Sequence, residues 1–95
     1  FQMFDTYKSE KITLIVENSL MKYIIDQFGI DVYTEKYDDN HFSAQVTVSA
    51  SPNFFRWIFG WGGRIVIRSP ESVVFQYRKM IESIIEQQKI FLHSN

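Results

Sequence analysis

The ten residues from His41 to Ala50 alternate between polar and apolar side chains, and this pattern constrains the fold more than any other feature. Successive side chains of a β-strand point to opposite faces, so the alternation predicts a strand with one buried face. The buried face would hold Phe42, Ala44, Val46 and Val48, and the other face His41, Ser43, Gln45, Thr47 and Ser49. Residues 11–17 alternate in the same way. We therefore expect a sheet that is covered on one face only.

Two Ser-Pro pairs, at positions 51–52 and 69–70, mark the expected starts of two helices. Serine caps free backbone N–H groups, and proline at the first helical position loses no hydrogen bond. The first pair predicts a helix that ends at Gly60. The second predicts the longest helix of the chain, which we expect to end near Gln88.

The remaining segments complete a recognisable order of elements. Apolar residues at helical spacing predict a helix from Asn18, as its cap, to Gly29, as its terminator. Further strands are expected at residues 31–37 and 64–68, with a turn at 38–40. The order is then βαββαβ plus an extra C-terminal helix, which predicts an α+β ferredoxin-like sandwich with helices on one face of an antiparallel sheet. Without strand bulges, the open face would carry Thr13, Ile15, Arg64 and Arg68.

The length of 95 residues allows one domain. We expect residues 1–10 to lead in from a preceding domain, residues 11–90 to form the fold, and residues 91–95 to fray. The chain has no cysteine, which excludes disulfides and thiolate metal sites. No apolar run approaches the length of roughly 18 residues that spans a bilayer. We therefore expect a soluble, cytoplasmic protein with no membrane partner.

No catalytic group, metal site or cofactor is predicted. The two histidines, His41 and His93, lie beside a turn and near the chain end, where neither is poised for catalysis. Asp38 and Asp39 are explained by turn geometry. The Gly-rich segment 60–63 follows a helix and precedes a strand, the reverse of the order that places a phosphate on a helix N-terminus.

Three arginines are the candidates for binding an anionic ligand. Arg56, Arg64 and Arg68 lie in a stretch without acidic residues between Asn40 and Pro70, although the formal net charge of the chain is -1. Together they could hold a short single-stranded nucleic acid through phosphate contacts. The third strand lacks the stacking aromatics of RNA-recognition modules, so that established mode is not expected. The alternative is that the three arginines are simply solvated.

The helix after Pro52 carries more apolar residues than a two-layer domain can bury on one side. Phe55, Trp57 and Trp61 are therefore candidates for an interface with another part of the parent protein or a second copy. The alternative is that both tryptophans fold back over the edge of the core.

An ordered series of motifs is similar to a known family: residues 17–20 (ENSL), 24–29 (IIDQFG), 51–63 (SPNFFRWIFGWGG) and 69–73 (SPESV). Over about residues 1–87 the chain resembles the C-terminal extension domain of bacterial WYL-domain transcriptional regulators. Trp61 departs from the family, which usually has phenylalanine there. The Trp-Tyr-Leu motif of the central domain of these regulators does not occur.

The resemblance implies a non-catalytic regulatory domain. In such regulators an N-terminal helix-turn-helix binds DNA, a central WYL domain senses a ligand, and the extension supports dimerisation and the response to the effector. The expected partners are thus a second copy and the helix-turn-helix and WYL domains of the parent chain. Some family members bind single-stranded DNA, which keeps the anionic-ligand alternative open.

Overall fold

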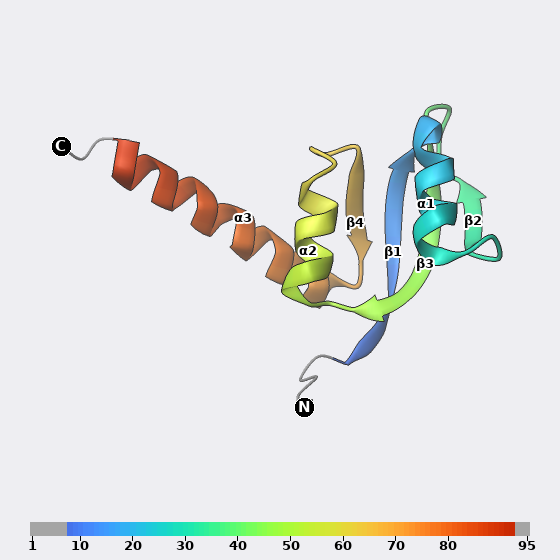
Figure 1. The fold of residues 1–95 in the computed structure, drawn as a ribbon, viewed down its shortest axis with the longest axis horizontal. Helices are drawn as coiled ribbons and strands as arrows, with labels where there is room; N and C mark the ends of the chain where they lie inside the picture. The colour runs from blue at the N-terminus through green and yellow to red at the C-terminus, as the bar shows by residue number, and fades with distance from the viewer. Residues whose placement is uncertain (1–7, 93–95) are drawn as a thin grey trace.

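The computed structural model describes residues 8–92, which form a four-stranded antiparallel sheet with helices (Figure 1). The elements in chain order are β1 (Ser9–Glu17), the 3-10 turn η1 (Asn18–Leu20), α1 (Met21–Phe28), β2 (Tyr33–Lys36), β3 (His41–Ser49), α2 (Pro52–Phe59), β4 (Ile65–Ser69) and α3 (Glu71–Leu92). The predicted order of strands and helices is confirmed. The fold is α+β.

The strands lie in the order β2-β3-β1-β4, and every neighbouring pair is antiparallel. This is the strand order of the ferredoxin-like sandwich, and α3 is the added C-terminal helix. The long strands β1 and β3 pair along their whole length, from Ser9 opposite Ser49 to Glu17 opposite His41. The alternating pattern of both strands therefore meets in register, which places their apolar residues on the same face.

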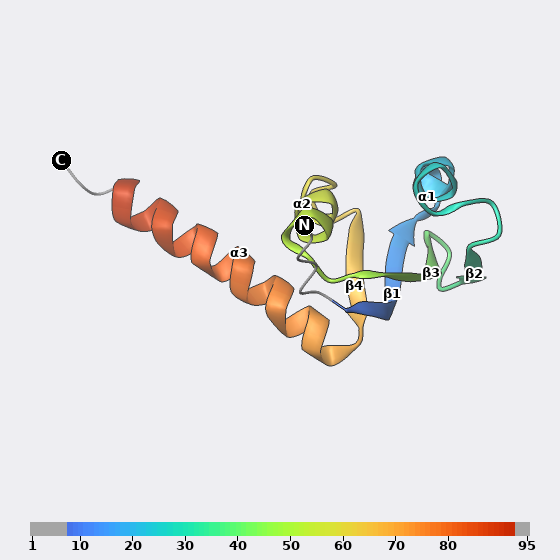
Figure 2. The ribbon, with the colours of Figure 1, turned by 60° about the horizontal axis from the view of Figure 1, so that its bottom comes forward.

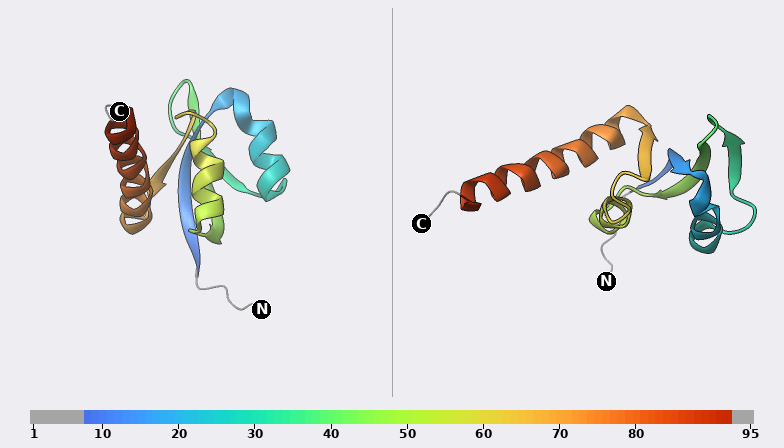
Figure 3. Two further views of the ribbon diagram at one scale, coloured as in Figure 1. Left: turned by 60° about the vertical axis from the view of Figure 1, so that its left-hand side comes forward. Right: turned by 90° about the horizontal axis from the view of Figure 1, so that it is seen from above.

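Helices α1 and α2 cover one face of the sheet, and within residues 8–92 no helix covers the other face (Figure 3). The core lies between these two layers. It consists of Ile12, Leu14, Val16, Leu20, Ile24, Phe42, Ala44, Val46, Ala50, Phe54, Phe55, Ile58, Ile65, Ile67 and Val73. The apolar side chains expected on the buried faces of β1 and β3 are all in this cluster or packed against it.

The helix starts agree with the sequence in one case and differ in two. Ser51 Oγ accepts a hydrogen bond from the N–H of Phe54, as expected for an N-cap. Asn18 does not cap; its side chain instead donates to the carbonyl oxygen of Asp39 at 3.1 Å. In α3 the N–H groups of Val73 and Val74 donate to the carbonyl oxygen of Pro70. Ser69 belongs to β4 and α3 starts at Glu71, one residue later than expected.

Helix α3 is longer than expected and leaves the body of the domain (Figures 1 and 2). It has 22 residues. At a rise of about 1.5 Å per residue, a helix of this length extends about 33 Å. Residues 91–92, expected to fray, are its last helical residues. At the other end β1 begins at Ser9, and residues 1–7 and 93–95 lie outside the described part of the chain.

The protruding helix makes the molecule extended. The radius of gyration of the Cα atoms is 15.2 Å. A compact chain of the same length would have a radius of gyration of about 12 Å. Much of α3 therefore lies away from the sandwich that the rest of the chain forms.

Candidate interaction surfaces

The structure does not bring the three candidate arginines together. Arg56 lies on α2, in the helical layer, where it donates to the Oδ1 of Asn53. Arg64 precedes β4 and Arg68 lies within it, and the open face of the sheet is opposite the layer that holds Arg56. A single site that contains all three guanidinium groups is therefore ruled out in this conformation.

Arg64 is engaged at the end of β1. Its Nε lies 3.1 Å from Oε1 of Glu17, and its Nη2 lies 3.4 Å from the Oγ of Ser19. The carbonyl oxygen of Arg64 also accepts the N–H of Glu17 at 3.1 Å. Its positive charge is thus compensated by a neighbouring carboxylate and is less available to an anionic ligand.

Arg68 occupies the open face at an irregularity in β4. Leu14 pairs with Ile67, but Thr13 pairs with Ser69, so Arg68 is the extra residue of a bulge. Its guanidinium carbon lies 5.8 Å from the centre of the Tyr37 ring. This is a cation–π arrangement. The bulge, which the sequence does not reveal, does not move Arg68 off the expected face.

Two tyrosines at the edge of the sheet belong to this open face, and the sequence did not single them out. Tyr33 of β2 pairs with Gln45 of β3, which is exposed on the side away from the core, and directly opposed residues share a face. Tyr37 follows the same strand and lies against Arg68. About half of each tyrosine is exposed, at 55% for Tyr33 and 51% for Tyr37. We define Tyr33, Tyr37 and Arg68 as the open-face cluster.

The hydroxyl of Tyr33 donates to Oε2 of Glu35, two residues further along β2. This hydrogen bond, together with the charge of the carboxylate, raises the pKa of Tyr33 above its usual value.

Ile15, expected on the open face, lies there between Ser43 and Val66, although only 9% of it is exposed. The face is therefore polar and aromatic at the β2 edge and more closely packed at its centre.

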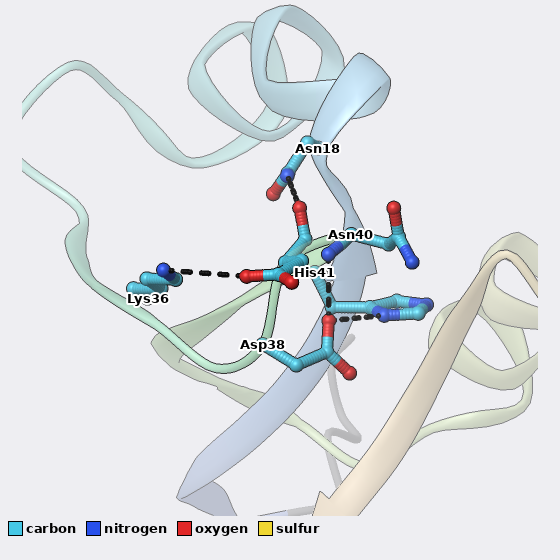
Figure 4. Close-up of polar contacts among 6 residues, drawn as sticks. Asn18, Lys36, Asp38, Asn40 and His41 are labelled. Carbon is cyan, nitrogen blue, oxygen red and sulfur yellow. Dashed lines mark hydrogen bonds and ion pairs between the residues drawn. The ribbon is translucent and has the colours of Figure 1, made fainter.

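A group of polar contacts holds the turn between β2 and β3 (Figure 4). The Oδ1 of Asp38 accepts the N–H of Asn40 and lies 2.8 Å from Nδ1 of His41. These two hydrogen bonds, the one from His41 first, lower the pKa of Asp38. Lys36 Nζ lies 3.5 Å from the carboxylate of Asp39. Asp38 and His41 thus define the shape of the turn.

Within residues 8–92, no three His, Asp or Glu side chains gather in a way that could hold a metal ion. In the same part of the chain, no helix combines the length and the apolar character needed to cross a membrane.

Phe54 and Phe55 of α2 pack within the domain, whereas Phe59 at the end of the same helix is 45% exposed. Phe55 is 7% exposed, and its ring centre lies 5.6 Å from that of Tyr77 on α3. It belongs to the core and not to an exposed surface. We expected Phe55 at an interface, but its side chain is not exposed. Tyr77 of α3 packs against it.

Trp57 and Trp61 follow the alternative in which they fold back over the edge of the core. The ring of Trp57 meets Phe28 of α1 edge-on at 5.5 Å, and the two indoles lie 5.9 Å apart. Trp61 also lies 5.2 Å from Tyr23 of α1. Both tryptophans are half-buried, and they fill the space between α1 and α2. No partner is needed to explain their apolar character.

Six of the twelve exposed large hydrophobic side chains among residues 8–92 lie on α3 instead. Val73 is fully buried, and Val74, Tyr77 and Met80 pack against the core. From Glu82 to Leu92 every residue is exposed. The large apolar side chains of this half are Ile84, Ile85, Ile90, Phe91 and Leu92, between 44% and 69% exposed. We call residues 81–92 the free half of α3, because this segment lies away from the sandwich; Phe91 nevertheless has an interaction partner within the structure.

The strand order, the helix-free sheet face and the added helix define a ferredoxin-like α+β domain with a C-terminal extension. Residues 8–85 match the family model of the WCX domain, and the chain belongs to this family. The resemblance inferred from the sequence motifs is confirmed at the level of the domain. No curated protein and no solved structure matches the chain significantly.

Proposed function

We propose that this chain is a non-catalytic regulatory domain that acts by self-association, with α3 as its contact surface. The supporting observation is the free half of α3, which presents five large apolar side chains at 44% to 69% exposure. An apolar surface of this kind on a small domain is typical of a protein-protein contact. The proposal moves the interface from α2, where the sequence pattern suggested it, to α3.

Membership of the WCX family supports the wider setting. The domain would then follow a DNA-binding helix-turn-helix and a ligand-sensing WYL domain in a transcriptional regulator. In that arrangement, self-association of the extension holds two DNA-binding domains at a defined separation. A change in the WYL domain on binding an effector could then alter the distance or orientation between them.

Sedimentation velocity on the chain tests self-association directly. We expect a reversible shift from monomer to dimer as the concentration rises from about 5 µM to several hundred µM, the range of a modest interface. Ile84→Lys, which places a charge in the apolar stripe, should keep the chain monomeric. Ser83→Lys adds the same charge one residue away, outside the stripe, and should leave the dimer intact.

Far-UV circular dichroism of both variants controls for loss of helix. A wild-type chain that stays monomeric across this range, or a dimer that Ile84→Lys leaves unchanged, contradicts the proposal.

A second function is favoured by the open-face cluster. Tyr33 and Tyr37 offer rings on which bases could stack, and Arg68 could contact a phosphate, as in proteins that bind single strands. The proposed site for an anionic ligand therefore consists of Arg68 with two tyrosines, and no longer includes Arg56 and Arg64. Stacking contributes about 1–3 kcal/mol per base, so Tyr37→Ala should weaken binding of a labelled oligonucleotide by roughly 5- to 150-fold.

Arg56→Ala is the matched control, because Arg56 lies in the opposite layer and should leave oligonucleotide affinity unchanged. Fluorescence anisotropy at two salt concentrations measures both variants, and the affinity should fall as salt rises. Equal affinities for the wild type and Tyr37→Ala would remove the open-face cluster from nucleic-acid binding.

A further inference from the structure

One stripe of residues, apolar except for Gln88, runs along α3, and its two halves have different surroundings. Its members recur at alternating intervals of three and four residues: Val74, Tyr77, Ile81, Ile84, Gln88 and Phe91. This is the spacing of the a and d positions of a two-helix coiled coil. The first two residues pack against the core of their own domain, and the stripe then continues into the free half of α3.

The packing of the first half restricts how a second α3 can approach. Tyr77 contacts Phe55 of α2, so the body of the domain already occupies the stripe side of α3 at that level. In a parallel pair, residue 77 of each helix would face residue 77 of the other, and the two bodies would compete for the same space. An antiparallel pair places the two bodies at opposite ends, where the free halves alone overlap.

We propose that two copies of this chain pair through the free halves of α3 in antiparallel orientation; this rests on the self-association proposed above. In an antiparallel pair, each a position of one helix faces a d position of the other helix. Ile81 of one copy would lie opposite Phe91 of the other, and Ile84 opposite Gln88. The two-fold axis passes near residue 86, and each pairing occurs twice.

The charges of the free half agree with this pairing. Its charged residues are Glu82, Glu86 and Lys89, all on the side of the helix away from the stripe in heptad terms. The positions that flank the seam are Ile85 and Leu92 on one side and Gln87 on the other. A second copy therefore meets apolar or neutral side chains along the whole seam and no like charge.

The size of the seam predicts a weak and reversible contact. Twelve residues extend about 18 Å, and we expect such a seam to bury less than the roughly 1,200 Å² typical of stable interfaces. Gln88 adds a polar group at a seam position, a placement that lowers stability but favours one register over others. A second copy can thus bind to the seam of α3 and dissociate from it again.

Disulfide trapping in mixed samples tests the orientation. The chain has no cysteine, so Ile84→Cys and Gln88→Cys each add a single thiol. In the antiparallel pair position 84 lies opposite position 88 of the other copy. An equimolar mixture under mild oxidation should therefore yield the mixed dimer as the main covalent product. A disulfide requires a Cα separation of about 4.4–6.8 Å, which makes trapping sensitive to register.

Mass spectrometry distinguishes the mixed dimer from the two homodimers. Predominance of the homodimers indicates a parallel pair, and a random distribution, with half of the product mixed, indicates contact without a register; either overturns the antiparallel proposal. Ser83→Cys, outside the stripe, should give only background product. Sedimentation velocity on the wild-type chain separates the two proposals: a dimer with the wrong trapping pattern refutes only the orientation, and a monomer refutes self-association itself.

Discussion

Replacing Phe55 by alanine distinguishes a core residue from an interface residue. Phe55 is 7% exposed and contacts both Phe54 on its own helix and Tyr77 on α3. Truncating a buried phenylalanine removes its transfer free energy and leaves a cavity, which together cost about 3–5 kcal/mol. Domains of this size have roughly 5–15 kcal/mol in total, so Phe55→Ala should lose a large part of the stability.

Urea denaturation followed by far-UV circular dichroism measures the change. We expect the free energy of unfolding to fall by about 3–5 kcal/mol with an unchanged denaturant slope. Since about 1 kcal/mol corresponds to about 4–8 °C in a domain of roughly 60–100 residues, Tm should fall by at least about 12 °C. The sample should be dilute, because self-association would add to the apparent stability.

Ile84→Ala is the contrasting variant, because Ile84 is 44% exposed on the free half of α3. Its effect on the stability of the monomer should stay within roughly 1 kcal/mol, the range of surface positions and helix propensity. A loss below about 1 kcal/mol for Phe55→Ala would show that this side chain is not packed in solution. The contact of α3 with α2 would then be refuted, together with the steric reasoning for an antiparallel pair.

Three further predictions follow from local geometry. Gly63 has φ +93° with nothing near its added Cβ, whereas a Cβ at Gly60 would meet ordinary contacts at 3.5 Å. Gly63→Ala should therefore destabilise the domain by about 1–2 kcal/mol, and Gly60→Ala should not; urea titration compares them, and equal effects would refute the strain. The lowered pKa of Asp38 stabilises the fold above about pH 4, and this contribution is lost as the pH falls through the folded pKa. His41→Ala should move that pKa back toward its usual value, which a carboxyl-carbon NMR titration would detect, and an unmoved pKa would refute the assigned cause. The ion pair of Arg64 with Glu17 joins half-exposed groups. Arg64→Ala should therefore lose at most about 1 kcal/mol, and a loss above about 2 kcal/mol by urea titration would contradict this.

The parts of the fold that the sequence predicts are those with a strong local signal. The alternation of β1 and β3 and the Ser51 cap each depend on a few neighbouring residues, and the structure confirms them. The tyrosines of the open-face cluster depend on a longer-range relation. β2 has only four residues, and none is buried, so its pattern does not reveal which face is which. Only the register of β2 against β3 shows which face holds Tyr33, and only the contact with Arg68 places Tyr37.

The surroundings of the aromatic side chains also depend on contacts between elements, which the sequence does not reveal. The pattern of α2 shows that Trp57 is apolar, but not that Phe28 and Tyr23 of α1 lie close enough to cover both tryptophans. Conversely, the spacing of the stripe along α3 can be read from the sequence, but its division into a packed half and an exposed half cannot. The body of the domain ends at about Met80, so the same stripe is partly buried at its start and exposed beyond Ile81.

The free half of α3 should be ordered by pairing and not by its own stability. An isolated helix of fewer than about 12–15 residues has marginal stability in water. In the monomer, the free half is stabilised only by continuing the helix of the packed first half. Amide hydrogen exchange measured by NMR resolves the two halves. Val73 is fully buried, whereas Ile84 and Ile85 are exposed. In dilute solution the amides of Ile84 and Ile85 should exchange at least about tenfold faster than that of Val73.

At a concentration that favours the dimer, protection at Ile84 and Ile85 should rise while that of Val73 stays constant, because pairing buries one half of the helix and not the other. Ile84→Lys should remove this dependence on concentration at Ile85. Protection that is equal in both halves and independent of concentration would mean that the helix is rigid without a partner. Self-association could then no longer be coupled to the folding of the free half, and a regulatory change would have to act through rigid-body movement alone.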